Sequence, residues 1–210
     1  MNSLRRPTAV LALACAGGAA LLACSMPPAT SHAAPARAAT TATDRATADK
    51  ALRSIVRLAE ERAATADTVA AAKWGTAQPI DVPAREKVVL DGMAAKAAKL
   101  GIDGPTVHRV FEDQIAANKV VQRALYAQWR AHPSQRATRR PDLTTEVRPV
   151  LDRVDGRLLT ALKEAQPLLS RSGCTAAVDR DTAATVKVKG LDSIHRKGLD
   201  RALVHLCRAV

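Results

Sequence analysis

Two cationic side chains lie on what the sequence predicts to be the apolar face of one long helix. Arg62 and Lys73 are eleven residues apart, and eleven steps of about 100° complete three turns with roughly 20° left over. The other positions of this stripe are apolar: Ile55, Ala59, Ala66 and Val69. Because such a stripe normally packs into a core, its cations should meet buried anions, and the chain supplies few fixed partners there. The pattern therefore predicts a pocket for a negatively charged ligand.

A second predicted helix repeats the pattern with neutral amides. Asn118 and Gln122, one helical turn apart, interrupt a face that is otherwise apolar: Val107, Phe111, Ile115, Leu125 and Trp129. A buried amide without a partner costs about 1–3 kcal/mol, so the simplest interpretation is that the two bond each other or neighbouring backbone. Alternatively, the amides and the two stripe cations together supply donors and acceptors to one polar ligand.

Helices must position these residues, because the composition favours helices throughout. Ala, Leu, Arg, Lys and Glu dominate the 210 residues, and runs of β-branched residues are few. Apolar residues make up 47% of the chain, enough for a core. No mid-chain stretch approaches the roughly 20 apolar residues of a transmembrane helix. We therefore predict an all-α fold, a single helical domain of about six helices without a membrane span.

Turn and capping residues divide the chain. Asp81 is the expected N-cap of the second helix and Asp103 that of the third, while Gly101 should end the second. The expected helices cover residues 48–74, 82–100, 104–132, 145–169, 174–187 and 190–208. Those within 48–133 would carry the ligand site, and those within 145–210 would complete the domain.

The first 33 residues have the features of an export signal. Arg5 and Arg6 precede an apolar run over residues 10–23. Cleavage after Ala33 fits the small residues there, whereas Leu-Leu-Ala-Cys ending at Cys24 resembles a lipobox and would leave a lipid-anchored N-terminus. Residues 34–47, rich in Ala and Thr, are expected to be a disordered linker before the helical domain of residues 48–210.

Cysteine usage agrees with export to a secreted or periplasmic location. Outside the signal only Cys174 and Cys207 remain, and a lone pair in an exported protein is most simply a disulfide. Such a bridge would stabilise the fold by roughly 4 kcal/mol. The alternative is two unrelated buried thiols. The five histidines show no metal-ligand spacing, so we predict no metal.

The joint spacing of the candidate site residues resembles that of the all-helical chorismate mutases, specifically their secreted class. The resemblance covers about residues 50–210, and the cysteine pair fits that class's disulfide. Lys73 follows Arg62 by eleven residues, and Arg85 follows Lys73 by twelve. The matching positions are Arg62, Lys73, Arg85, Glu86, Phe111, Asn118, Gln122 and Arg148.

This resemblance implies an isomerase that rearranges chorismate to prephenate, a step of aromatic amino acid biosynthesis, and it suggests a homodimer. The reaction is an intramolecular pericyclic shift that needs no cofactor. The enzyme holds a dianion in a compact shape and stabilises charge on the breaking ether oxygen. By resemblance, Arg62 and Arg148 would bind carboxylates as bidentate forks, and Lys73 with Gln122 would donate to the ether oxygen. The other matched residues would assist: Arg85 at the anion, Glu86 at the hydroxyl and Asn118 at a carboxylate.

Three positions differ from the residues expected in this family, and they affect which roles can be assigned by resemblance. Val82 stands where many relatives have Asp near the hydroxyl, and Val89 stands where a secreted relative would offer Gln. Both leave Glu86 as the main candidate for hydroxyl recognition. Gln122 occupies a position where some secreted members have Glu, which is a conservative change because Gln donates a hydrogen at any pH.

A different class of function competes with the enzyme. The formal net charge is +12, which would suit a non-catalytic exported protein that binds a small dianion or an anionic surface. Nucleic-acid binding fits poorly, because four aromatic residues leave no stacking platform. A membrane-surface helix would separate a basic face from a large apolar face, whereas here the cations interrupt the apolar face. Chorismate turnover, as opposed to binding alone, distinguishes the two functions.

Overall fold

The computed structural model of the chain describes residues 34–207, with side chains from residue 42 onward. The expected export signal, including Cys24, lies outside the described residues. Within them the chain forms helices and no strand, which confirms the predicted all-α class. The six α-helices are α1 (Ala34–Lys73), α2 (Pro83–Leu100), α3 (Gly104–Ala131), α4 (Arg148–Leu169), α5 (Cys174–Lys189) and α6 (Ser193–Ala202). A 3₁₀ turn, η1 (Pro133–Gln135), and a π-helical turn, η2 (Leu143–Val147), connect α3 to α4.

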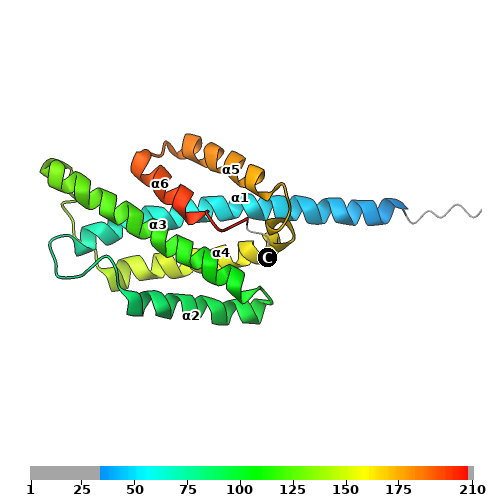
Figure 1. Ribbon diagram of the computed structural model, residues 1–210, viewed down its shortest axis with the longest axis horizontal. Coiled ribbons are helices and arrows are strands. Elements are labelled where there is room, and N and C mark those ends of the chain that lie inside the picture. Colours follow the sequence, from blue (N-terminus) through cyan, green and yellow to red (C-terminus); the bar gives the residue numbers. More distant parts are fainter. Residues whose placement is uncertain (1–33, 208–210) are drawn as a thin grey trace, which may run out of the picture.

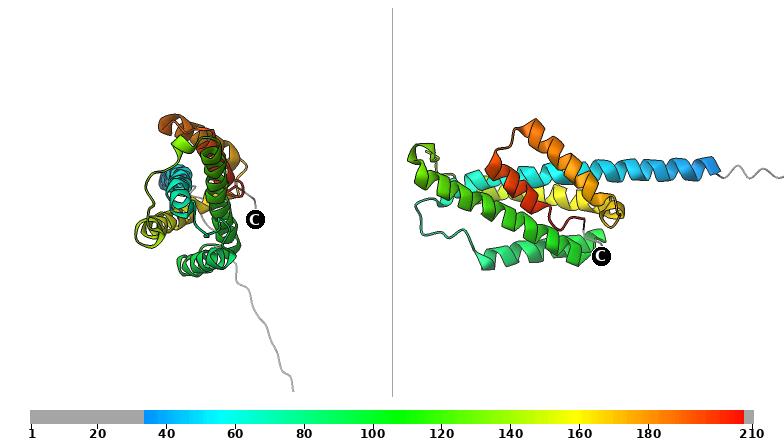
Figure 2. Two further views of the ribbon diagram at one scale, coloured as in Figure 1. Left: turned by 90° about the vertical axis from the view of Figure 1, so that its left-hand side faces the viewer. Right: turned by 45° about the horizontal axis from the view of Figure 1, so that its top comes forward.

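α1 is the axis of the molecule. It packs against α3, α4, α5 and α6, whereas α2 packs mainly on α3. Figures 1 and 2 show α2 on one side of the bundle and the α5–α6 pair on the opposite side. The largest buried cluster includes Ile55, Phe111, Leu158 and Leu199, one residue from each of four helices. α1 thus places its apolar stripe at the centre of the domain.

The N-terminal part of α1 differs from the expectation of a disordered linker over residues 34–47. This segment is helical and extends beyond the bundle, as Figure 1 shows. The described side chains before Ala48 are exposed, and Ala48 is the first buried one. The segment contains many alanines and no glycine, and alanine has the highest helix propensity. A helix can therefore continue there without support from packing.

Two of the three predicted caps are confirmed. Asp103 accepts a hydrogen bond from the Thr106 amide at the start of α3, and Gly101 ends α2 in the left-handed conformation with φ of 67°. The prediction that Asp81 caps α2 is wrong. The N-cap position is Val82, and the Glu86 carboxylate accepts from its amide. Asp81 pairs instead with cations of α3, described below.

The C-terminal helices are tied to the rest of the fold. The predicted disulfide between Cys174 and Cys207 is present and joins the first residue of α5 to the segment after α6. The buried carboxylate of Asp113, on α3, contacts Arg201 and lies 2.9 Å from both the amide and Nδ1 of His205. No helix in the described part of the chain is long and apolar enough to cross a membrane.

Candidate active site

The face of α1 that carries Arg62 and Lys73 packs into the interior, as the sequence predicted. Ile55, Ala59, Ala66 and Val69 are buried, and Arg62 on the same face is only 4% exposed. Lys73 is the last residue of α1 and is partly buried. Arg62 is therefore almost fully buried in the interior, and Lys73 is buried in part.

Arg62 has a fixed anionic partner, which corrects the expectation that the chain offers few. Its Nε donates to Asp155 Oδ1 on α4 at 2.6 Å, and its Nη1 donates to the Gln114 carbonyl on α3 at 2.9 Å. Both charged side chains of the pair are about 95% buried. A buried charge without a partner is costly, so Asp155 explains why α1 can carry an arginine on its core face.

The two amides of α3 lie beside Arg62 and bond each other. Gln122 Nε2 donates to Asn118 Oδ1 at 2.7 Å. Asn118 Nδ2 lies 3.0 Å from the Thr65 hydroxyl and 3.4 Å from the Arg62 carbonyl on α1. The simple interpretation of mutual hydrogen bonding therefore holds for this pair. One atom of the pair, Gln122 Oε1, is buried and has no hydrogen-bond partner among the described residues.

Lys73 faces the segment that connects α1 to α2. Its Nζ donates to the Pro79 carbonyl at 2.8 Å and lies 3.5 Å from the Ile80 carbonyl. Burial, together with the charge of Lys119, lowers the pKa of Lys73, and the charges of Asp81 and Glu86 oppose this effect. An ammonium group has three N–H donors, so one of them has no acceptor within the described part of the chain.

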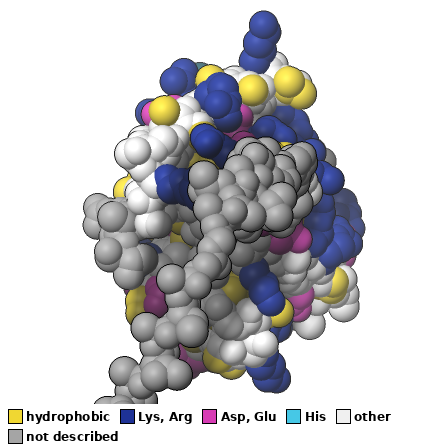
Figure 3. All heavy atoms as spheres, turned by 90° about the vertical axis from the view of Figure 1, so that its right-hand side faces the viewer, with side chains coloured by type: hydrophobic (Ala, Val, Ile, Leu, Met, Phe, Trp, Pro, Cys, Tyr) yellow, Lys and Arg dark blue, Asp and Glu magenta, His cyan; other side chains and the backbone are white. Residues whose placement is uncertain are grey.

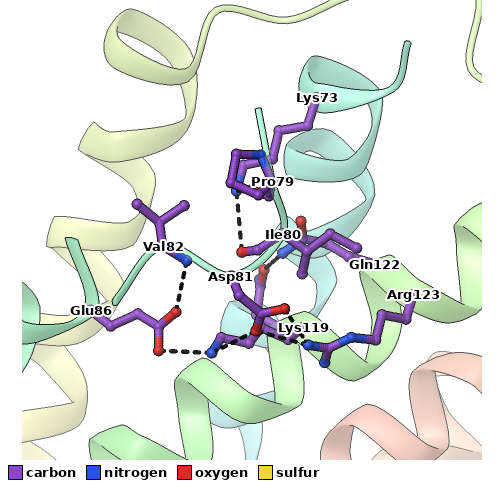
Figure 4. Close-up of polar contacts among 10 residues, drawn as sticks. Lys73, Pro79, Ile80, Asp81, Val82, Glu86, Lys119, Gln122 and Arg123 are labelled. Atoms are coloured by element: carbon purple, nitrogen blue, oxygen red, sulfur yellow. Dashed lines mark hydrogen bonds and ion pairs between the residues drawn. The ribbon is translucent and has the colours of Figure 1, made fainter. Parts of the chain in front are cut away.

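Beyond Lys73, two carboxylates and two cations form a charged cluster. Lys119 Nζ lies 2.7 Å from Glu86 Oε2 and 3.1 Å from Asp81 Oδ1. Arg123 contacts both oxygens of Asp81 at 2.8 and 2.6 Å. Burial opposes the charge of Lys119, but its bonds to Glu86 and Asp81 raise its pKa overall. Figure 4 shows Lys73, Glu86, Lys119 and Gln122 around the segment of residues 79–82.

Aromatic side chains pack beside the end of α1. The ring of Trp74 meets the rings of Tyr126 and Trp129 edge to face, with centroids 4.8 and 5.4 Å apart. Arg130 lies over the Trp74 ring. The Tyr126 hydroxyl is buried and has no hydrogen-bond partner in residues 42–207, and burial raises its pKa. This cluster forms an apolar wall one turn from Gln122 and next to Lys73.

The structure does not bring every candidate residue into this cluster. Arg85 is exposed on α2, and Arg148 is exposed at the start of α4. Within residues 42–207 neither side chain forms a hydrogen bond or an ion pair, although the charge of Arg148 contributes to the lowered pKa of Asp142. Arg62, Asn118 and Gln122 are connected by hydrogen bonds, while Glu86 meets α3 through Lys119. The predicted roles of Arg85 and Arg148 remain predictions.

Sequence reasoning missed three charged residues of the site. Asp155 follows Val154 and precedes Leu158 on the apolar face of α4, so the pattern that revealed Arg62 could have found it. Lys119 and Asp81 carried no such signal, because their positions are not on an apolar stripe. No group of three His, Cys, Asp or Glu among the described residues is arranged to hold a metal ion.

Comparisons with known proteins agree with this geometry. Residues 45–123 match the family model "Chorismate mutase type II". The secreted chorismate mutase of Mycolicibacterium smegmatis is 34% identical over 79% of this chain and 92% of its own length. The one of Mycobacterium tuberculosis is 32% identical over 79% and 83%.

Solved structures give the same answer. The crystal structure of chorismate mutase from Burkholderia phymatum superposes with a TM-score of 0.72 at 34% identity, covering 77% of this chain and 99% of its own. That from Burkholderia thailandensis gives 0.71 at 38% identity, covering 75% and 99%. The identity to these relatives over most of their length, together with the shared all-helical fold, shows that this chain belongs to the chorismate mutase family.

Proposed function

We propose that this isomerase rearranges chorismate to prephenate between α1 and α3, around Arg62, Lys73 and Gln122. The observation that carries the proposal is the meeting of a buried arginine with an amide pair of α3, both of which keep N–H groups without an acceptor among the described residues. Oxygen atoms of a dianionic ligand can accept from these N–H groups, and hydrogen bonds between charged groups are among the stronger ones. The reaction needs fixed donors and charges, and these side chains supply both.

The chemistry assigns a role to each group. Arg62 binds a substrate carboxylate through the N–H groups that Asp155 and Gln114 leave free. Lys73 offers its remaining N–H to the ether oxygen, on which negative charge develops. Gln122 offers the second hydrogen of Nε2, because only one bonds Asn118.

Hydroxyl recognition belongs to Glu86 in this proposal. Its carboxylate accepts from the Val82 amide and from Lys119, and a carboxylate has about four lone-pair sites, so a substrate hydroxyl can still bond it. Asn118 lies at the carboxylate end beside Arg62. Arg148 and Arg85 assist as exposed cations whose long side chains can approach the dianion when it binds.

We also propose a cellular location and an oligomeric state for the enzyme. The names of the two curated relatives support export, with the chain either cleaved after Ala33 or lipidated at Cys24. We also propose a homodimer in which each site lies within one chain. Mass spectrometry of the mature N-terminus distinguishes cleavage from lipidation, and light scattering of the purified protein gives its oligomeric state.

The experiment that tests the function combines turnover with binding. Purified protein is mixed with chorismate, and the loss of chorismate and the appearance of prephenate are followed by absorbance and NMR. We expect prephenate to form at a rate that saturates with chorismate concentration. Saturable binding measured by calorimetry without any prephenate would instead support a non-catalytic protein that binds a small dianion.

A further inference from the structure

The ion pair between Arg62 and Asp155 joins two helices that are far apart in the sequence. Arg62 lies on α1 and Asp155 on α4, and the two helices pack along each other. Asp155 is 3% exposed. It touches no other side chain of the candidate site in a hydrogen bond or ion pair among the described residues, so any effect on the reaction must act through Arg62.

Two protein acceptors fix the guanidinium group. Asp155 takes the Nε–H and the Gln114 carbonyl takes one Nη1–H. Gln114 is held in turn, because its Nε2 donates to the Ala202 carbonyl at the end of α6 at 2.9 Å. Anchors from α4 and α3 therefore determine where a side chain of α1 points.

The remaining donors form the edge that can meet a ligand. A guanidinium has five N–H donors in a planar fork, and the two anchors use two of them. Both hydrogens of Nη2 and one of Nη1 are left. A carboxylate binds best to two parallel N–H groups, and this edge offers such a pair.

The negative charge of Asp155 opposes the binding of a dianionic ligand. Any benefit of Asp155 to the reaction must therefore come from the orientation that it gives to the Arg62 guanidinium. A carboxylate next to Arg62 reduces the positive potential that the ligand meets. Orientation of a binding group, however, is worth large factors in rate, because a misplacement of about 1 Å can cost roughly a hundredfold. An acceptor at the Oδ1 position is enough to hold Nε, whether or not it is charged.

We infer that Asp155 is a positioning residue for the reaction: it orients Arg62 so that its free edge faces a substrate carboxylate. This inference rests on the proposed function, because it requires Arg62 to bind the substrate. Asp155 itself does not touch chorismate. Its effect is therefore expected in substrate affinity more than in the chemical step.

The test compares substitutions that separate the acceptor from the charge. Asp155→Asn keeps Oδ1 in place and removes the charge, so we expect kcat/KM within about threefold of wild type. Asp155→Glu keeps the charge but moves the acceptor by one methylene, and Asp155→Ala removes both. For these two we expect KM to rise by about tenfold or more, with a smaller change in kcat. Asp152→Ala, an exposed position of the same helix, is the matched control and should change neither.

A double-mutant cycle shows whether Asp155 acts through Arg62. In an Arg62→Ala background, Asp155→Ala should leave kcat/KM unchanged within about twofold, since the group to be oriented is gone. Equal activity of wild type and Asp155→Glu, or a further loss in the double variant, would overturn the inference. If Asp155→Ala does not fold, as judged by circular dichroism, the comparison of Asp155→Asn with Asp155→Glu still tests the inference, which requires a higher kcat/KM for Asp155→Asn.

Calorimetric binding of prephenate to the same variants separates this inference from the proposed function. If wild type does not turn over chorismate, the proposed function fails. The inference then depends on the prephenate affinities of the variants. Wild type and Asp155→Asn should bind prephenate with similar affinity, and both should bind it more tightly than Asp155→Glu. An affinity that is lowest for Asn would show that Asp155 supplies charge, and it would overturn the inference.

Discussion

Gln122 is a buried amide that keeps one hydrogen for a ligand. It is 3% exposed, and one hydrogen of its Nε2 bonds Asn118. The other Nε2 hydrogen has no acceptor among the described residues. Gln122 can therefore donate to a substrate oxygen without losing its bond to Asn118.

The pH dependence of the rate tests the role of Gln122. A glutamine donates through its NH₂ without titrating, so the wild-type enzyme should keep this donor over the whole range from about pH 5 to 8. Glutamate donates only when protonated, and its ionised form repels a developing oxyanion. Gln122→Glu should therefore be slow at neutral pH and recover as the pH falls.

Gln122→Leu is the control for this prediction. It cannot donate at any pH, so it should be slow over the whole range. Turnover of the three proteins is measured from pH 5 to 8 with circular dichroism at each pH. A glutamate variant that is fastest at high pH would place Gln122 away from the ether oxygen.

Helical periodicity allowed those site residues to be predicted that interrupt an apolar face of a helix. A polar group on an apolar helical stripe stands out, and this signal found Arg62, Asn118 and Gln122, which lie together. It could not show that Asp155 would neutralise Arg62, because the pairing of α1 with α4 depends on tertiary packing. The position of Lys119 beside Glu86 likewise follows from the angle between α2 and α3.

At the scale of elements, α6 is the helix that closes the bundle over α1 and α3. A Cβ built on Gly198 would lie 2.5 Å from Val121 Cγ2 and 3.8 Å from Ala63 Cβ. His195, near the start of α6, places Nε2 2.9 Å from Asp67 on α1 and Nδ1 2.8 Å from Asp192. One close approach and one charged contact therefore determine how α6 packs.

The close approach gives a prediction for stability. Gly198→Ala should destabilise the protein by about 1–3 kcal/mol, because a β-branched neighbour in a packed core has little room to move. Gly156→Ala on α4 is the control, since nothing lies within 4 Å of its Cβ. Removing a helical glycine there should stabilise the fold by up to about 1 kcal/mol. Urea unfolding of both variants measures the difference, and equal stabilities would contradict the packing of α6.

The charged contact gives a prediction for pH dependence. Burial disfavours the charged form of His195, but its bonds to Asp67 and Asp192 outweigh this and raise its pKa. A raised folded pKa means that the contact stabilises fully below the unfolded value of about 6.5 and loses this effect as the pH rises through the folded value. The advantage of wild type over His195→Ala in thermal midpoint should therefore shrink from pH 5.5 to 9.

The control for this experiment is His108→Ala. His108 is exposed on α3 and pairs with Glu112 of its own helix, so its removal leaves the contact between α6 and α1 intact and should preserve the pH dependence of the wild type. If His195→Ala loses the same stability at every pH, the charge of His195 does not hold α6 to α1.

Element boundaries were predictable where local chemistry sets them. Asp103 and Gly101 act as caps because their roles depend on neighbouring backbone groups. Asp81 has the residue type of a cap, but Lys119 and Arg123 of α3 attract its carboxylate, a contact that no local pattern contains. The helical residues 34–47 show the converse, where a segment rich in Ala and Thr suggested disorder although alanine favours the helix.

At the scale of the whole molecule, one helix carries both cations and the rest of the chain supports them. α4 and α3 hold Arg62, the segment after α1 holds Lys73, and the disulfide with the Asp113 contacts ties the C-terminal segment to the bundle. The end from which α1 emerges shows many Lys and Arg side chains in Figure 3. Arg45, Arg53, Arg171 and Arg180 line a hollow of about 660 Å³ there, remote from Lys73 along α1.

We predict that catalysis depends on the cluster around Lys73 and not on the general basic charge of the protein. The most direct measurement is kcat for chorismate in wild type, Lys73→Ala and Lys87→Ala. Lys87 is an exposed lysine of α2 that pairs with Asp91, so its removal changes the net charge equally. We predict that Lys73→Ala lowers kcat by about a hundredfold or more, while Lys87→Ala leaves it unchanged. A folded Lys73→Ala variant with the turnover of wild type would contradict the account.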